Sequence, residues 1–432
     1  MARRLAVLLY GRRIGTLCQT DSGRHLFEYA DEPGTTPLSV AMPFVLRRHG
    51  HKAVEPFLDG LLPDNESVRL QTGDHFGVSG RNPFALLEHI GMDCAGAVQF
   101  CAEGEVDAAL AGGGTIRPLT RARVAGRLRR LRGDAGATWI TDLEEWSLAG
   151  AQPKIALRRT AAGWAEVSGG EPTTHILKPG IPALRASALN EHVCLRAVSR
   201  LGLPAASVEY DAFDGEDAIV VERYDRLVLA SGAVRRIHQE DICQALGVYP
   251  ASKYEVRGGP SAARVIRLLD DVAQPGDPGR FVDYLAVSYL LGAPDSHAKN
   301  FSLLELAGRV ELAPLYDVAS ALPYDPARDE RQDFAFSIGG ERRFGAITDR
   351  HWSKLAASAG MEDSAVIGRV HAVAEALPDA LHDVLAEAGS AADELGSRLL
   401  PRVQALCAWA LSPQPVTGDV WAVRPGRPGR TS

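Results

Sequence analysis

Paired cysteines and long apolar runs are both missing from this chain of 432 residues. Its six cysteines form no CxxC pair, which excludes a zinc ribbon and a disulfide framework and is typical of reduced thiols in a cytoplasm. The longest apolar run, Tyr284 to Ala293, is about half of the ~20 residues that cross a bilayer. The shorter run LAVLLY near the N-terminus is followed by Gly-Arg-Arg, so it predicts a first strand rather than a signal peptide. The sequence therefore predicts a soluble, cytoplasmic protein.

An excess of positive charge is missing as well. The net charge is −7, from 47 Lys and Arg against 54 Asp and Glu, which excludes a chain that binds nucleic acid through a global basic charge. Hydrophobic residues make up 46% and charged residues 23%, as in ordinary globular proteins, so the chain can bury large cores. Its length is enough for two or three packed units.

The first part of the chain mixes strand and helix patterns. Apolar alternation predicts a hairpin over residues 5–20 and a third strand over 25–30. Asn82 as N-cap and Gly91 past the end predict a helix between them. Residues 103–116, which end in AGGGTI, predict a linker or loop.

Residues 117–133 carry seven arginines around one apolar face, formed by Val124, Leu128 and Leu131. This helix either binds phosphate or a partner, or simply presents a solvated basic face. The second interpretation is the more frequent one for such helices.

Strand patterns then fill residues 147–226, interrupted by a helix for which Ser187 is the predicted N-cap. Helices dominate from about residue 237, where His238 and Glu240 of HQED are interpreted as helix-start capping. Strands followed by helices favour an α+β fold with a sheet-rich lobe and a helical lobe. The predicted division is 1–125 for an N-terminal α+β subdomain, 126–226 for a sheet-rich N-lobe, 227–411 for a helical C-lobe and 412–432 for a disordered tail.

An acid and an amide follow one of the predicted helices with four residues between them: Asp295 and Asn300 in GAPDSHAKNF. Protein kinases place a catalytic base and a magnesium-binding amide at this spacing, because one short loop must hold both in a fixed geometry. By itself the spacing is a weak signal. Asp317 follows after about the length of one hairpin, where a kinase needs a second metal ligand; alone, it could equally cap a turn.

The other pieces of a kinase lie upstream in the order that a kinase requires. Residues 149–154, AGAQPK, form a small-residue loop that could approach phosphate, although it is neither G-x-G-x-x-G nor a Walker A motif. Lys178 ends a strand where a kinase lysine contacts the α- and β-phosphates, and Glu191 could pair with it. The strand that ends at Glu222–Tyr224 could hold adenine through its backbone. Each piece alone is better explained as ordinary surface structure, but their order favours a kinase.

At these residues the chain resembles the HipA family, the serine/threonine kinase toxins of bacterial toxin–antitoxin pairs. The resemblance covers roughly residues 5–410 through the following stretches: PLSVAMP, FLDGLLPDNESVR, GAVQF, SLAGAQPKIAL, THILKP, NEHVCLRAVSRLGLP, VERYDR, HQEDICQALG, KYE…GGP of residues 253–260, GAPDSHAKNFSLL and LAPLYDVASALPY. It departs from ordinary protein kinases in lacking His-Arg before Asp295 and Phe-Gly after Asp317, which makes a usual activation loop doubtful.

The resemblance implies a two-lobed protein-kinase fold, ATP and Mg²⁺ as cofactors, and a role for each matching residue. Asp295 would be the catalytic base, Asn300 and Asp317 the magnesium ligands, and Ser147 an autophosphorylation site. The implied nucleotide contacts are Ala149, Gly150, Ala151, Gln152, Lys154, Lys178, Glu222, Arg223, Tyr224, His297, Lys299, Asn300 and Asp317. His297 could equally be a structural loop residue.

The resemblance also implies partners: a small helix-turn-helix antitoxin, operator DNA bound through it, and a substrate of the translation machinery such as an aminoacyl-tRNA synthetase. Two other functions stay open. One is an inactive kinase-like co-repressor that works with the antitoxin. The other is a small-molecule or lipid kinase, which the same residues would serve.

Overall fold

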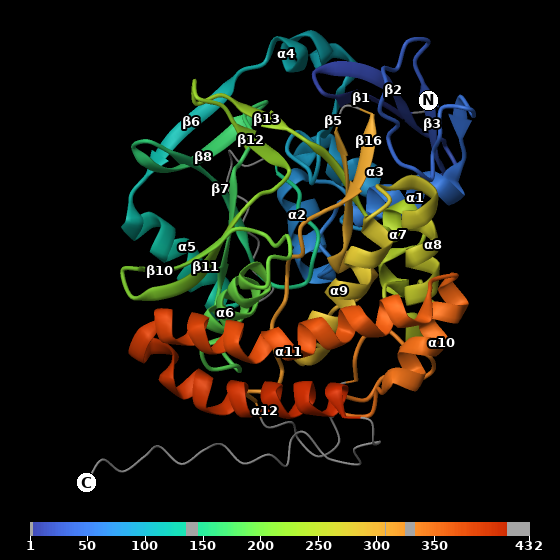
Figure 1. Ribbon diagram of the computed structural model, residues 1–432. Helices are drawn as coiled ribbons and strands as arrows, with labels where there is room; N and C mark the ends of the chain where they lie inside the picture. Colours follow the sequence, from blue (N-terminus) through green and yellow to red (C-terminus); the bar gives the residue numbers. More distant parts are fainter. Residues whose placement is uncertain (1–2, 135–145, 307, 325–332, 413–432) are drawn as a thin grey trace. The chain divides into compact units, whose positions relative to one another are not determined.

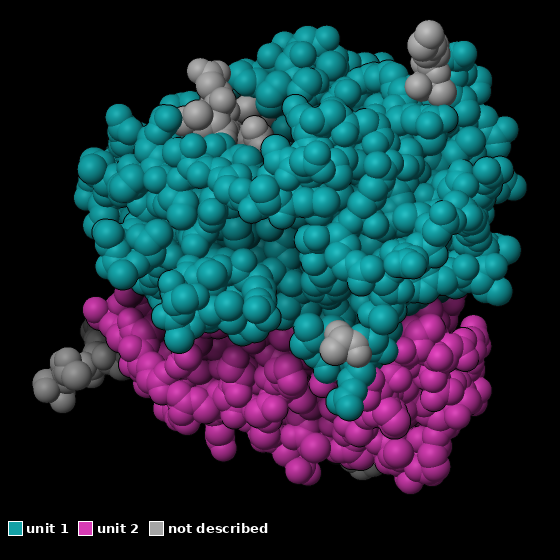
Figure 2. Space-filling view, turned by 90° about the horizontal axis from the view of Figure 1, so that it is seen from above, with its two compact units in different colours: residues 1–182, 209–253, 302–311 teal, residues 183–208, 254–301, 312–432 magenta. Residues whose placement is uncertain are grey.

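The computed structural model describes residues 3–134, 146–306, 308–324 and 333–412. The chain folds into two compact units, and each unit is built from several stretches of chain (Figure 2). Unit 1 comprises residues 1–182, 209–253 and 302–311, and unit 2 comprises residues 183–208, 254–301 and 312–432. The predicted tail lies outside the described residues except for Ser412. The four-part division of the sequence stays a prediction, because compactness alone divides the chain differently.

The first sheet of unit 1 has five strands in the order β4-β3-β2-β1-β5 (Figure 1). Strand β1 pairs with β2 on one side and β5 on the other, and both pairs are antiparallel. The strands of this sheet are β1 (Arg3–Leu9), β2 (Arg12–Gln19), β3 (His25–Tyr29), β4 (Arg48–His49) and β5 (Val98–Ala102), accompanied by α1 (His51–Gly60), α2 (Glu66–Phe76) and α3 (Pro83–Ile90). Apolar side chains of β1, β3, α1 and α3 share one buried core. The predicted hairpin, third strand and helix are confirmed, including the Asn82 side chain, which caps α3 by accepting from Ala85 N.

The second sheet of unit 1 has six strands in the order β10-β11-β9-β7-β8-β6. They are β6 (Gly114–Leu119), β7 (Ile155–Thr160), β8 (Gly163–Gly169), β9 (His175–Pro179), β10 (Val208–Phe213) and β11 (Glu216–Glu222). The apolar face of α5 (Arg121–Gly133) shares a core with these strands, because Val124, Leu128 and Leu131 are buried.

The prediction of a linker over residues 103–116 is wrong. These residues form η1 (Glu103–Glu105), α4 (Val106–Ala111) and the beginning of β6. Strand β6 pairs with β8 from Gly114 opposite Gly169 to Leu119 opposite Trp164. A partner about 50 residues away stabilises this strand, and the glycine-rich local sequence gives no sign of it.

Smaller elements complete unit 1. They are β12 (Arg226–Val228), β13 (Val234–Arg236), β14 (His238–Asp241), α7 (Ile242–Ala245), η2 (Pro250–Ser252) and β15 (Ser302–Leu306); β16 (Arg309–Leu312) joins the sheet β14-β15-β16. The capping prediction for His238 and Glu240 is wrong, because both are buried in β14. Asp241 caps α7 instead, in a capping box with Gln244.

Unit 2 is mainly helical, and α11 and α12 run side by side in it (Figure 1). Its elements are α6 (Ser187–Arg200), η3 (Glu255–Arg257), α8 (Ala262–Val272), α9 (Asp277–Leu290), η4 (Ala298–Asn300), α10 (Asp349–Ala359), α11 (Asp363–Glu387), η5 (Gly389–Ala392) and α12 (Asp393–Leu411). The N-cap of α6 is Ala186 in a left-handed conformation, so the prediction of Ser187 is wrong by one residue. No helix in the described part of the chain is long and apolar enough to cross a membrane.

Candidate active site

The Asp295 loop of unit 2 follows directly after helix α9. Most residues of α9 are buried, and the chain leaves it through Gly292, whose φ is +64°. A side chain at Gly292 would collide with Leu322, so the position requires glycine for space as well as for conformation. The loop then closes on itself, since the Asn300 side-chain nitrogen donates to the Asp295 backbone oxygen at 2.6 Å. That bond leaves the Asn300 side-chain oxygen as the atom that can face a metal.

The Asp295 carboxylate is the exposed group of this loop. Its side chain is 63% exposed, whereas the side chain of His297 is only 4% exposed. The Tyr254 hydroxyl donates to Asp295 Oδ1, and His297 Nε2 lies 3.6 Å from the same oxygen. The Tyr254 and His297 rings meet edge to face, with their centroids 4.8 Å apart. Tyr254 and His297 therefore orient a carboxylate that solvent can reach.

Tyr254 belongs to the KYE…GGP stretch that carries the resemblance, but the sequence gives its side chain no role. His297 and Lys299 were predicted to contact phosphate, and both are buried. The Lys299 backbone oxygen accepts from the Tyr316 hydroxyl at 2.8 Å. Their role toward nucleotide stays a prediction.

Asp317 lies on a segment of unit 2 that is fixed on both sides. Its φ is +58°, in the left-handed region that aspartate adopts far more readily than most residues. Before it, Leu315 exchanges backbone hydrogen bonds with Pro204 and Ala206, at 3.0 and 2.8 Å. After it, Ser320 is held by the Asn190 side chain of α6, which donates to the Ser320 oxygen at 2.7 Å and accepts from its nitrogen at 3.2 Å. A carboxylate and an amide oxygen are ligands that Mg²⁺ accepts, so Asp317 and Asn300 fit the metal that a kinase uses.

The Ser147 loop, residues 146–154 of unit 1, contains the predicted nucleotide loop. Ser147 is fully buried, and its hydroxyl donates to the Leu61 oxygen at 2.8 Å. Gly150 has a φ of +106°, and a Cβ there would lie 2.4 Å from Lys154 Nζ. That ammonium group donates to the Ala149 oxygen at 2.6 Å. The loop is thus wound tightly around the Lys154 side chain, and glycine is needed at its centre.

Lys178 lies on β9, opposite Ile219 of β11 in the register of the sheet, and is 6% exposed. Gln152 of the Ser147 loop donates to the Pro179 oxygen at 3.4 Å, which brings this loop to the end of the same strand. Within unit 1 the structure therefore brings the Ser147 loop and the end of the Lys178 strand together.

The predicted adenine hinge, Glu222 to Tyr224, follows β11. The Arg223 guanidinium is buried and donates to both oxygens of Asp225 and to the Cys94 backbone oxygen. Its backbone nitrogen donates to the Thr174 oxygen at 2.9 Å. Burial opposes its charge, but Asp225 and Asp93 outweigh burial and raise the pKa of Arg223. The Arg223 backbone oxygen accepts from Arg226 N at 3.1 Å, so the guanidinium and both backbone groups of Arg223 are already hydrogen-bonded within unit 1.

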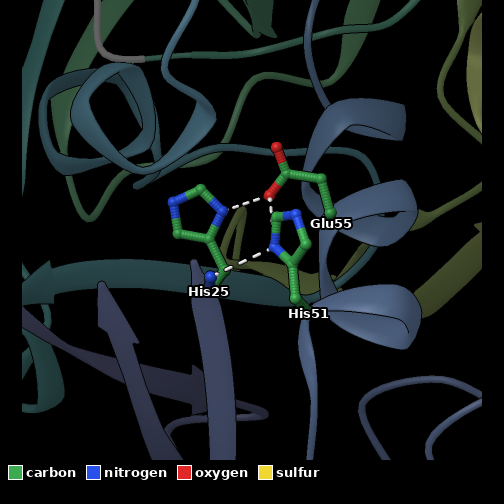
Figure 3. Close-up of side chains that lie close together, drawn as sticks. All are labelled: His25, His51 and Glu55. Atoms are coloured by element: carbon green, nitrogen blue, oxygen red, sulfur yellow. Dashed lines mark hydrogen bonds and ion pairs between the residues drawn. The ribbon is translucent and has the colours of Figure 1, made fainter. Parts of the chain in front are cut away.

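His25, His51 and Glu55 form a group that could hold a metal ion, because one ligand atom from each lies within 4.8 Å of the others (Figure 3). His51 Nδ1 accepts from the His25 backbone nitrogen at 3.2 Å, and His25 Nδ1 faces Glu55. His25 Nε2 lies 2.8 Å from the Gln19 side-chain nitrogen. The Asn82 oxygen accepts from that nitrogen and caps α3, which fixes the orientation of both amides.

This orientation assigns the proton of His25. Because Gln19 donates to Nε2, the proton of neutral His25 lies on Nδ1 and is donated to Glu55. The two ring nitrogens nearest Glu55 are therefore already occupied by hydrogen bonds. A metal would require both amides to turn and α3 to lose its cap, so the hydrogen bonds explain this group without a metal.

Two family models match the chain. The model described as HipA-like C-terminal domain matches residues 146–381, and the model described as HipA N-terminal domain matches residues 5–101. The putative kinase Y4mE of Sinorhizobium fredii is 36% identical over 383 residues, which cover 87% of this chain and 90% of that protein. The serine/threonine-protein kinase toxin HipA of Shewanella oneidensis is 28% identical over 351 residues, 77% of each chain.

A solved complex of HipA, HipB and operator DNA from Shewanella oneidensis MR-1 contains a similar chain. The TM-score is 0.81 at 27% identity, covering 94% of this chain and 97% of that one. The predicted α+β, kinase-like fold is confirmed by this match.

Proposed function

The chain belongs to the HipA family of serine/threonine kinases, as its motifs predicted, and we propose that it is the toxin of a bacterial toxin–antitoxin pair. In this proposal it transfers a phosphoryl group from ATP to a serine or threonine of a protein target and thereby arrests growth. The observation that carries the proposal is the Asp295 loop. Its exposed carboxylate is oriented by Tyr254 and His297, and Asn300 closes the loop behind it.

The proposed roles follow from the donor and acceptor atoms of each group. Asp295 accepts the proton of the attacking hydroxyl, since it is the exposed carboxylate of its loop. Asn300 and Asp317 hold Mg²⁺, which comes with ATP and neutralises phosphate charge. Lys178 and Lys154 contact phosphate, together with the backbone of residues 149–152. The backbone of Glu222 to Tyr224 holds the adenine, and His297 and Lys299 contact phosphate.

We further propose that Ser147 is phosphorylated by the kinase itself and that this silences it. Ser147 is fully buried and its hydroxyl is hydrogen-bonded to Leu61, so it must leave this position before it can be phosphorylated. A phosphate adds about −1.5 to −2 charge, and an unpaired charge of that size is very costly to bury. The modified loop therefore cannot return to its place, and the nucleotide loses its contacts with residues 149–154.

The proposed partners are a small helix-turn-helix antitoxin and, through it, operator DNA. The support is the similar chain in the HipA, HipB and operator DNA complex. The proposed target is a protein of the translation machinery such as an aminoacyl-tRNA synthetase, met in the cytoplasm. This part of the proposal rests on the family alone, and phosphopeptide mass spectrometry of expressing cells would identify the target.

The test of the kinase is phosphate transfer by the purified protein with ATP and Mg²⁺, read by phosphopeptide mass spectrometry. We expect phosphate on Ser147 and on a protein substrate, with Asp295→Asn and Asp317→Asn each lowering transfer by about 10²-fold or more. Ser147→Ala should abolish only the first signal. If nothing is labelled and Asp317→Asn behaves like wild type, the chain is an inactive co-repressor. Transfer to free alcohols or lipids but not to protein would make it a small-molecule kinase.

A further inference from the structure

Two backbone segments from the first hundred residues hold the Ser147 loop at its beginning and in its middle. We call residues 61–64 and 93–96 the brace. Ser147 N donates to the Asp93 oxygen at 3.0 Å, and the Ser147 hydroxyl donates to the Leu61 oxygen. Asp64 N donates to the Gly150 oxygen at 3.1 Å, as part of a parallel bridge between Pro63 and Gly150. The loop thus has three hydrogen bonds to the brace within four residues.

Side chains fix the first brace segment in turn. Lys253 Nζ donates to the Asp64 carboxylate at 2.8 Å, and the two side chains are only 16% and 13% exposed. Arg69 donates to the Pro63 backbone oxygen and pairs with Asp59 at the end of α1. The ion pair with Lys253 fixes the Asp64 side chain. It thereby helps to hold the Asp64 backbone nitrogen where it donates to the Gly150 oxygen.

The second brace segment lies in a buried cluster of five charged groups. Asp93 accepts from Thr173, through nitrogen and hydroxyl at 3.0 and 2.7 Å, and from Arg226 at 2.8 Å. Asp225 accepts from Gly96 N at 2.7 Å, and Arg223 and Arg226 both donate to the Cys94 oxygen. The third arginine is Arg236. Burial alone would raise the pKa of Asp93, but the three arginines outweigh it and hold that pKa well below its usual range.

This cluster joins two parts of the proposed nucleotide site within unit 1. Arg223 belongs to the proposed hinge, while the Asp93 backbone receives the first hydrogen bond of the Ser147 loop. The resemblance leaves open the role of two stretches, FLDGLLPDNESVR and GAVQF. The first contains the brace residues 61–64, and the second begins at Gly96, the last residue of the other brace segment. Their position explains why a kinase would keep such a subdomain next to its nucleotide loop.

We propose that the brace is a latch for the Ser147 loop, in which Asp64 and Asp93 are positioning residues that set how often the loop opens. This inference rests on the proposed function of the loop. A latched loop binds nucleotide and conceals Ser147, and an open loop exposes Ser147 and has lost its nucleotide contacts. Weakening the latch should therefore lower nucleotide affinity and speed phosphorylation of Ser147, two effects of opposite sign. General destabilisation would act throughout the protein, so a control that weakens a distant ion pair separates it from opening of the latch.

The first experiment measures opening without any activity. Amide hydrogen exchange by mass spectrometry is compared for wild type, Asp64→Ala and a control, Asp283→Ala. The control removes an ion pair of similar length, Arg369 to Asp283 at 2.7 Å, whose acid is also 13% exposed and which lies on helices of unit 2. We expect exchange in peptides over residues 146–154 to be about threefold to tenfold faster in Asp64→Ala. Asp283→Ala should leave these peptides at the wild-type rate.

A milder variant protects the test against misfolding at the buried cluster. Thr173→Val keeps the shape of the side chain but removes the hydroxyl that donates to Asp93, and Thr173→Ser restores it. Thr173→Val should speed exchange over residues 146–154, and Thr173→Ser should return it toward the wild-type rate. Unchanged exchange in both Asp64→Ala and Thr173→Val would overturn the latch.

The second experiment uses the proposed kinase. Asp295→Asn protein, with and without Asp64→Ala, is offered as a substrate to Ser147→Ala enzyme, which has no Ser147 of its own to label, and phosphate on Ser147 is followed over time. We expect faster labelling of the double variant by about the factor found in hydrogen exchange, and weaker binding of ADP by calorimetry. Faster exchange without any labelling would overturn the kinase proposal and leave the latch standing. Labelling at equal rates in both proteins would overturn the latch and leave the kinase standing.

Discussion

Asn190→Ala should most directly loosen the segment that carries Asp317. The Asn190 side chain is 1% exposed and binds both the nitrogen and the oxygen of Ser320, itself 2% exposed. Alanine leaves one buried donor and one buried acceptor without their partner, at about 1–3 kcal/mol each. The free energy of unfolding should therefore fall by about 2–6 kcal/mol, out of the ~5–15 kcal/mol typical of a folded protein.

The same change should act on metal binding. Asp317 lies three residues before Ser320 and has a left-handed backbone that its surroundings must maintain. When Ser320 is released, we expect the Asp317 carboxylate to lose its fixed position. A displacement of 1 Å can cost about 10²-fold in rate. Phosphate transfer should fall by about that factor, and the Mg²⁺ concentration for half-maximal activity should rise.

The assay is urea denaturation together with Mg²⁺ titration of phosphate transfer, with Asn82→Ala as the control. Asn82 caps α3 of unit 1, so its loss should cost about 1 kcal/mol of stability, and its side chain is hydrogen-bonded to Gln19 and Ala85. The Mg²⁺ requirement of Asn82→Ala should equal that of wild type. The reasoning is refuted if the two variants share one Mg²⁺ requirement, or if Asn190→Ala unfolds with less than about 1 kcal/mol lost.

Two further predictions concern unit 1. Glu305 is buried next to Glu240, and burial raises its pKa; the folded state then holds a proton that the unfolded state releases, so stability should fall as pH rises from about 5 to 8. Glu305→Gln should flatten this dependence in thermal melts at several pH values, and an unchanged slope would contradict the assignment. Gly150→Ala should weaken ADP binding in calorimetry about 10-fold or more, because a Cβ would meet Lys154 Nζ at a φ of +106°; Ala151→Gly is its control, and equal affinities would contradict the tight winding of the loop.

Local patterns predicted the elements that local interactions specify. Apolar alternation is enough to predict β1, β2 and β3, and an asparagine N-cap followed by proline is enough to predict α3, because these signals lie within the element itself. The linker prediction failed at β6 because its pairing with β8 is non-local. The capping prediction at His238 failed because strand β14 is formed by pairing with β15, more than 60 residues later.

The residues of the candidate site also fall into two groups, those that the sequence predicts and those that only the structure reveals. Asp295, Asn300 and Asp317 could be found because a kinase requires a fixed spacing of chemical groups. The side chains that orient them could not. Tyr254 lies 41 residues from Asp295, and Asn190 lies 130 residues from Ser320. Both residues lie in stretches that carry the resemblance, but their local sequence does not say which distant atoms they hold, so only the folded chain reveals it.

The arginine-rich helix α5 shows why composition alone left two interpretations open. Glu166 of β8 pairs with Arg117 and Arg127, and Glu216 of β11 pairs with Arg129 and Arg132. Both acids are nearly buried, at 5% and 6% exposed, and a buried carboxylate that loses its cation is strongly destabilising. A phosphate that recruited these arginines would have to leave Glu166 or Glu216 uncompensated. Four of the seven arginines therefore neutralise nearly buried acids of the six-stranded sheet, which favours the interpretation without a bound phosphate.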